Sequence, residues 1–347
     1  MSPNKNSKGI MSDQSYIKET QEAAIFALTS LKDDLGSIPE KIIAQACKKN
    51  PWFSPFFIQE AANGIRTWLE EDLLRNWLGK YAIPERKTQV GIIMAGNIPL
   101  VGMHDLVAGL LSGCELYIAP SRRDKVLIVW VLEKIMAASP ALKKNIHIVE
   151  NLPQNIDLLI ATGSDNAARY FSYQYQGVPC LIRRNRTSVA VLDEAVTQKD
   201  VAELAKDVFL YNGLGCRNVS HIIALQSFSK SLLTVWDDYP TSHLHTFYLS
   251  KFARERAKTQ WLGQPHEVYG KAVLTPSSDF NPPPMGVIRF QQFDTTAEIN
   301  HWLTQYQDRL QCVVGKNVPF GHSQQPKLYD YADGVDTMKF LRNRTLS

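Results

Sequence analysis

The feature that most constrains the fold of this chain is a series of short apolar segments that alternate with helical patterns between residues 89 and 192. We expect these apolar segments to form buried strands; they are residues 89–95, 115–119, 145–149, 156–161, 179–182 and 188–192. Strands that alternate with helices predict an α/β fold, in which helices cover both faces of a mostly parallel sheet. Ligands bind such sheets at the carboxyl ends of the strands.

The flanking regions divide the chain into four parts. Residues 1–15 are rich in Ser, Asn, Lys and Asp and are predicted to be disordered, whereas residues 16–80 carry the apolar stripes of helices. A second α/β region follows residue 196. We therefore predict a tail and helical region at 1–88, an α/β domain at 89–195, a second α/β domain at 196–325, and a C-terminal segment at 326–347.

Composition restricts the setting in which the protein works. The net charge of +4 is small and no basic run marks a nucleic-acid tail, so we expect no nucleic-acid partner. No stretch reaches the roughly 18 unbroken apolar residues of a membrane helix, and the N-terminus has no apolar segment of signal-peptide type. The five cysteines, an odd number without a CxxC pair, are typical of free thiols in a reducing cytoplasm. We expect no metal site.

One cysteine, Cys216, lies in the stretch Gly213-Leu214-Gly215-Cys216-Arg217-Asn218. A helical pattern over residues 201–210 precedes this stretch, and the apolar run 221–225 follows it. Cys216 is therefore predicted to lie in a bend between a helix and a buried strand, where glycine lets the backbone turn and a substrate approach. The charge of Arg217 would favour the thiolate, the nucleophilic form. A catalytic thiol and an inert buried cysteine both remain open on this stretch alone.

Two loops follow predicted strands of the first α/β domain. They are Gly96-Asn97-Ile98-Pro99 and Thr162-Gly163-Ser164, and Ser164 is a candidate N-cap of the next helix. A helix start suits a phosphate or pyrophosphate, because its N–H groups are free and its dipole is positive there. The usual dinucleotide fingerprint GxGxxG is absent, so these loops predict a ligand-binding edge without naming the ligand.

Taken together and in this order, the motifs resemble the aldehyde dehydrogenase superfamily. The resemblance is greater to its fatty acyl-CoA reductases, the aldehyde-forming reductases of bacterial luminescence and their non-luminous relatives. It rests on residues 95–99, 162–164, 184–192, 213–218, 318–321 and 330–337, and it covers roughly residues 89–341. The resemblance implies an aldehyde dehydrogenase-like fold, with a parallel-sheet cofactor-binding domain at 89–195 and an α/β catalytic domain at 196–325.

The resemblance also implies roles for single residues. Cys216 would attack an activated acyl group and form a thioester on the enzyme. The Asn97 side chain and the Cys216 backbone N–H would donate hydrogen bonds to the oxyanion of that step. Gly163 and Ser164 would hold the pyrophosphate of a nicotinamide cofactor. Phe320 would pack near the nicotinamide, although a plain core position is an equally good interpretation of this phenylalanine.

In one segment the sequence departs from the oxidising members of the superfamily. Those enzymes carry a glutamate in a Glu-Leu-Gly-Gly-Lys segment, and this glutamate activates water to hydrolyse the thioester. The matching residues here, 184–188, read Arg-Asn-Arg-Thr-Ser and contain no acid. A reductase should not hydrolyse its acyl intermediate, so the missing base is consistent with reduction.

A second departure concerns the adenosine ribose, which the oxidising members hold with a Lys-Pro pair. Here the pair is Ala119-Pro120, and Ser121, Arg122 and Arg123 follow at once. Arginine can bind a 2′-phosphate with two hydrogen bonds, so this segment favours NADPH over NADH. A solvent-exposed helix start is the alternative interpretation of the two arginines.

We therefore predict an NAD(P)H-dependent reductase that converts an acyl-CoA to an aldehyde. An acyl phosphate, or an acyl group delivered by a partner synthetase or transferase, is the nearest alternative donor. A non-catalytic scaffold is the alternative of another class. The resemblance further implies a homo-oligomer.

Overall fold

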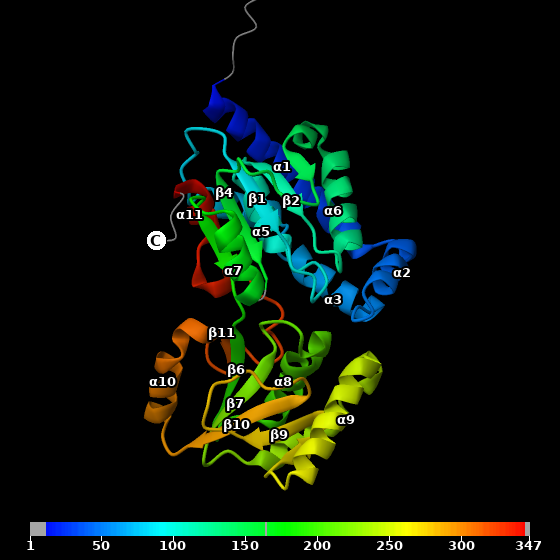
Figure 1. Cartoon of the computed structure of the whole chain (residues 1–347), viewed down its shortest axis with the longest axis vertical. Coiled ribbons are helices and arrows are strands. Elements are labelled where there is room, and N and C mark those ends of the chain that lie inside the picture. The colour runs from blue at the N-terminus through cyan, green and yellow to red at the C-terminus, as the bar shows by residue number, and fades with distance from the viewer. Residues whose placement is uncertain (1–11, 164, 344–347) are drawn as a thin grey trace, which may run out of the picture.

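The computed structural model describes residues 12–163 and 165–343. It has two lobes, each built around a β-sheet (Figure 1). The expected α/β architecture, with a helical N-terminal region, is confirmed. Helix α1 (Asp13–Gly36) begins inside the segment 1–15 that we expected to be disordered, because Ser12 caps it by accepting a hydrogen bond from the Ser15 N–H. Residues 1–11 lie outside the described chain.

The described chain before the first strand contains four helices; the first two pack on helices of the first sheet, and the other two pack on the first helix. The four are α1, α2 (Glu40–Lys49), α3 (Pro55–Arg66) and α4 (Glu71–Leu78). Helix α3 starts where the sequence supplies both an N-cap and a suitable first residue: the Ser54 side chain accepts from the Phe57 N–H, and Pro55 follows it. The buried side of α1, which includes Leu28 and Leu31, joins the main core of this lobe.

The first sheet is entirely parallel, in the order β3-β2-β1-β4-β5. Its strands are β1 (Gln89–Ile93), β2 (Glu115–Ala119), β3 (Ile146–Ile148), β4 (Leu158–Thr162) and β5 (Cys180–Arg183), with helices α5 (Met103–Leu111), α6 (Lys125–Ala138) and α7 (Asp165–Gln174) and the 3-10 turn η1 (Pro140–Lys144). The chain builds outward from β1 to β3 and then returns to place β4 on the other side of β1. Such a reversal opens a ligand-binding crevice at the strand ends, here between β1 and β4.

The second sheet has the order β11-β6-β7-β10-β9-β8, with only β8 and β9 antiparallel. Its strands are β6 (Thr187–Leu192), β7 (Val219–Leu225), β8 (Glu267–Tyr269), β9 (Ala272–Pro276), β10 (Val287–Phe293) and β11 (Leu310–Val314). Helices α8 (Gln198–Phe209), α9 (Thr246–Trp261) and α10 (Thr296–Gln305) accompany them, with 3-10 turns η2 (Leu210–Gly213), η3 (Lys230–Asp238), η4 (Thr241–His243) and η5 (Gln307–Arg309). The chain changes sheet between Arg183 and Thr187, earlier than the domain boundary expected at residue 195.

After β11 the chain returns to the first lobe, where the 3-10 turn η6 (Ala332–Gly334) and helix α11 (Thr337–Asn343) lie beside the first sheet (Figure 1). Arg183, at the end of β5, holds this return. Its guanidinium donates to the Ala332 carbonyl at 2.8 Å and the Thr337 hydroxyl at 2.8 Å, and pairs with buried Asp105 at 2.6 Å. The C-terminal segment therefore crosses the space between the two lobes.

Candidate active site

The loop that carries Cys216 is shaped by the backbone before it and by one buried side chain after it. Helix α8 ends at Phe209, and Tyr211, Asn212 and Gly213 then take three successive left-handed conformations, with φ of 55°, 57° and 69°. Strand β7 begins at Val219, so the expected placement of Cys216 between a helix and a buried strand is confirmed.

The Asn218 side chain fixes the shape of this loop through its hydrogen bonds. Its Oδ1 accepts from the Gly215 N–H at 2.8 Å, and its Nδ2 donates to the Leu210 carbonyl at 2.8 Å. The same Nδ2 lies 3.1 Å from the Asp207 carbonyl, at the end of α8. One amide thus ties the loop to the helix in front of it, which presents Cys216 in a defined position.

The Cys216 side chain is exposed, but the protein around it still removes much of its hydration. This partial burial raises the pKa of the thiol, and the nearby charge of Arg217 lowers it by less. The expected effect of Arg217 is therefore present, but desolvation is the larger effect and the net shift of the pKa is upward. Ser188, on β6, donates to the Cys216 carbonyl at 2.9 Å and so holds the backbone of the nucleophile.

Asn97 lies against the same loop. Its Nδ2 donates to the Leu214 carbonyl at 2.8 Å, although the two residues are 117 positions apart in the sequence. The structure thus brings together Asn97 and the Cys216 loop, two elements that the sequence placed in different domains. Because an amide nitrogen carries two N–H bonds, one remains available for a substrate oxygen.

The loops expected to hold a cofactor lie at the carboxyl edge of the first sheet. A Cβ atom placed on Gly96 would lie 2.7 Å from Ser121 Oγ and 3.1 Å from Arg123 Cβ, so the loops after β1 and β2 are in close contact. A Cβ on Gly163 would lie only 3.0 Å from Ala167 Cβ, so the absence of a side chain at this position lets α7 start close to β4. The candidate N-cap Ser164 lies outside the described residues.

Four further residues are predicted for the cofactor, three of them directly after β2 and one in the second lobe. Pro120 is half-buried directly after β2, and Arg122 is exposed, as is Arg123. Phe320 is half-buried in the second lobe, where it packs on the core of that lobe; a Cβ on Gly315 would come within 2.9 Å of its ring. Their roles toward a cofactor stay predictions.

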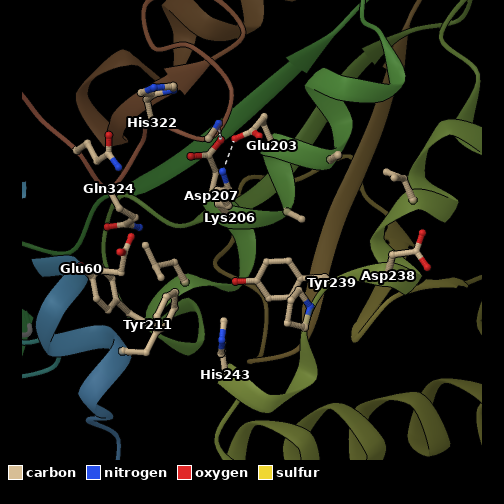
Figure 2. A pocket seen from close by; sticks show the side chains of 18 residues that line it. Glu60, Glu203, Lys206, Asp207, Tyr211, Asp238, Tyr239, His243, His322 and Gln324 are labelled. Carbon is tan, nitrogen blue, oxygen red and sulfur yellow. Dashed lines mark hydrogen bonds and ion pairs between the residues drawn. The ribbon is translucent and has the colours of Figure 1, made fainter. Parts of the chain in front are cut away.

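Next to the Cys216 loop lies a cavity that no sequence pattern indicated. It has a volume of about 510 Å³ and is bounded by α3, α8, the segment 239–243 and the loop 321–325 (Figure 2). From α3 come Phe56, which stacks on His243 with ring centroids 4.0 Å apart, and Glu60. Gln324 lies beside Glu60, and Tyr239 lies across the cavity from them. Side chains so far apart in sequence leave no local pattern to detect.

The carboxylate of Asp333, in η6, is a second group that the sequence pattern did not indicate. It pairs with Arg186 at 3.2 Å, and its backbone takes a left-handed φ of 60°. Its charge raises the pKa of Cys216, so this acid acts electrostatically on the nucleophile although residues 184–188 contain none. Burial raises the pKa of Asp333 itself, against the lowering effects of Arg183 and Arg186.

The fold and this site define the class of the protein. The chain resembles solved aldehyde dehydrogenases: aldehyde dehydrogenase 21 from Physcomitrella patens (TM-score 0.68, 10% identity, 97% of this chain and 85% of that chain), and a putative aldehyde dehydrogenase from Burkholderia cenocepacia (TM-score 0.63, 13% identity, 85% and 72%). A Mycobacterium tuberculosis aldehyde dehydrogenase complexed with NAD+ is also similar (TM-score 0.61, 15% identity, 84% and 71%). At these identities the likeness shows the fold, which is that of the aldehyde dehydrogenases.

The match to a sequence family narrows the class of the protein further than the fold does. The sequence model of the acyl-CoA reductase (LuxC) family matches residues 10–227, and the chain belongs to this family. The expected resemblance is thereby confirmed. Family and fold together support an aldehyde-related oxidoreductase. No curated protein matches the chain significantly.

Proposed function

We propose that this protein reduces an acyl-CoA thioester to an aldehyde with NAD(P)H, through a covalent acyl intermediate on Cys216. The observation that carries the proposal is the hydrogen bond of Asn97 to the Leu214 carbonyl, which sets a second amide N–H beside the nucleophile. The match to the acyl-CoA reductase family supports the substrate class.

In the first step the Cys216 sulfur attacks the thioester carbonyl carbon. A carbon–sulfur bond to Cys216 forms, the bond to CoA breaks, and the Cys216 proton passes to the departing CoA sulfur. The oxyanion of this step would accept from the free N–H of Asn97 and from the Cys216 backbone N–H. Because burial raises the pKa of the thiol, a smaller fraction of Cys216 is ionised at a given pH than of an ordinary cysteine.

In the second step the acyl carbon is reduced and leaves as the aldehyde, which returns the Cys216 thiolate. A reduced nicotinamide, when bound, would supply the hydride. The strand order places a crevice between β1 and β4 at the carboxyl ends of the strands, where sheets of this kind bind such a cofactor. We propose that Gly163 and Ser164 hold this pyrophosphate and that NADPH is the preferred cofactor. The likeness to an aldehyde dehydrogenase complexed with NAD+ supports the nicotinamide class.

Hydrolysis of the intermediate would waste the acyl group, and the residues around Cys216 argue against it. No acid stands in residues 184–188, and the neighbouring Asp333 is engaged by Arg186. The acyl-Cys216 thioester should therefore persist until a reduced nicotinamide binds.

The cellular location and the partners of the protein are part of the same proposal. All five cysteines are free, which supports a reducing cytoplasm. No helix in the described parts of the chain has the length and apolar character to cross a membrane. We propose acyl-CoA as the small-molecule partner, with an acyl-protein synthetase or transferase as a possible acyl source, and a homo-oligomer.

The decisive experiment separates acyl transfer from reduction. The protein is incubated with acetyl-CoA or palmitoyl-CoA without a cofactor, and its intact mass is measured; NADPH or NADH is then added and the loss of absorbance is followed. We expect one acyl group on the parent and on the control Cys47→Ala, and none on Cys216→Ala. Acylation of Cys216→Ala, or an unacylated parent, would refute the proposal.

A further inference from the structure

The cavity beside the active site is joined to the nucleophile loop by two contacts. The amide of Gln324 lines the cavity and lies against Gly215, the residue before Cys216: a Cβ on Gly215 would be 3.3 Å from Gln324 Oε1. On the other side, the apolar wall formed by Phe56 and Tyr211 continues to Ile98, the residue after Asn97. The cavity therefore adjoins the loop that carries Cys216.

The cavity also has a polar group of three side chains. The Glu60 carboxylate, on α3, lies near the hydroxyl-bearing rings of Tyr211 and Tyr239 (Figure 2). Burial raises the pKa of Tyr239 to about 12 and raises that of Tyr211 further, and the negative charge of Glu60 adds to both shifts. Within the described part of the chain, none of the three makes a side-chain hydrogen bond or ion pair. The carboxylate and the two hydroxyl groups are therefore available for hydrogen bonds to a ligand.

The remaining charges of the lining do not neutralise Glu60. Lys206 is the only lysine or arginine among the described lining residues, and it is paired with Glu203 at 2.6 Å. Asp207 accepts from the backbone N–H groups of Gly321 and Ser323. Asp238 adds a second carboxylate without a partner in the described chain. The cavity is therefore net negative, which disfavours the phosphates of CoA and favours a donor or a cation.

We propose that this cavity holds the acyl chain and that Glu60 selects acyl groups whose chain carries a hydrogen-bond donor, an amine or a hydroxyl, over unsubstituted chains. The inference rests on the proposed function, because it takes the acyl group to be attached at Cys216. The apolar wall of Phe56 and Leu210 accommodates the methylene part of the chain, and the polar group of Glu60, Tyr211 and Tyr239 recognises its substituent. A plain chain would displace water from the half-buried Glu60 carboxylate without offering it a donor, and that loss is costlier than the lack of one apolar contact.

The test compares two Glu60 variants with a charge-matched control. Glu60→Gln keeps an acceptor and removes the charge, Glu60→Leu removes both, and Glu133→Gln removes an exposed carboxylate of α6 that does not line the cavity. Each is assayed with hexanoyl- and octanoyl-CoA series that end in a methyl, a hydroxyl or an ammonium group, and kcat/KM is compared. In parallel, binding of the same ligands to Cys216→Ala, with and without the Glu60 changes, is measured by calorimetry.

We expect the parent and Glu133→Gln to prefer the substituted chains. Glu60→Gln should lower the preference for ammonium over methyl by about tenfold or more, the worth of a charge-assisted hydrogen bond, and change the hydroxyl series less. Glu60→Leu should lower both preferences and bind the methyl series at least as well as the parent. Thermal unfolding identifies variants that fail to fold, and the calorimetry then decides on the variants that do fold.

Two results would overturn the inference. One is a parent that prefers methyl-ended chains in both lengths, and the other is a preference that is the same in the parent and both Glu60 variants. Either result leaves the proposed function intact if Cys216 is still acylated by the methyl series. By contrast, absence of Cys216 acylation in every series refutes the proposed function. In that case calorimetry still measures how Glu60 affects ligand binding.

Discussion

Asn218 offers the most direct test of how the structure positions Cys216, because its side chain is buried, with 5% of its surface exposed, and lies two residues beyond the nucleophile. Asn218→Ala removes the 2.8 Å bond from the Gly215 N–H and the 2.8 Å bond to the Leu210 carbonyl. Each buried group left without a partner costs about 1–3 kcal/mol. The free energy of unfolding should therefore fall by about 2–6 kcal/mol, the sum of two such losses.

The assay is urea unfolding followed by circular dichroism, with Asn63→Ala, an exposed asparagine of α3, as the matched control. The control should stay within about 0.5 kcal/mol of the parent. Iodoacetamide labelling of Cys216, read by mass spectrometry, should change in rate only for the Asn218 variant, because its loop is no longer held. Equal unfolding midpoints for Asn218→Ala and Asn63→Ala would refute the reasoning.

A variant that keeps the size of the side chain separates hydrogen bonding from packing. Asn218→Asp retains the acceptor for Gly215 but turns an oxygen toward the Leu210 carbonyl. The ionised form is disfavoured there, so the pKa of the new carboxyl should be raised in the folded state. With a raised folded pKa, its contribution to stability is present at acidic pH and is lost as the pH rises. A purely steric role for Asn218 would instead give a pH-independent difference from the parent.

The remaining predictions concern catalysis and the cofactor. Asn97→Ala should lower the turnover number by roughly a hundredfold or more, the usual loss of one oxyanion donor, and leave acyl-CoA binding little changed; an unchanged steady-state turnover removes Asn97 from the site. Replacing Arg122 and Arg123 together by Ala should raise the KM for NADPH about tenfold or more at fixed salt and spare NADH, while equal losses for both cofactors would make them surface residues. Since burial raises the pKa of Cys216, its acylation rate should keep rising with pH beyond the ordinary thiol range, and Arg217→Leu should move the profile further upward; a profile that levels off near neutral pH contradicts this.

Much of the fold follows from local sequence pattern. The apolar segments that alternate with helical spacing predicted the parallel first sheet, because a strand buried on both faces must be apolar throughout its length. The position of Cys216 between α8 and β7 was likewise predictable, since a helical period, a glycine-rich bend and an apolar run follow one another in the sequence. Asn97 and Cys216 could both be named as site residues from the motifs that hold them.

What the sequence left undecided depends on residues that meet through space. Strand β6 reads as one more strand of the first series, yet it pairs with β7 and β11, because strand pattern does not specify which neighbour a strand will find. Similarly, Arg217 beside Cys216 suggested a thiolate, but desolvation by the surrounding chain outweighs the charge of an adjacent residue. Only the tertiary structure brings Glu60 and Tyr239, 179 positions apart, to one cavity. Burial and electrostatic coupling depend on the packed environment, and no local period of the sequence records it.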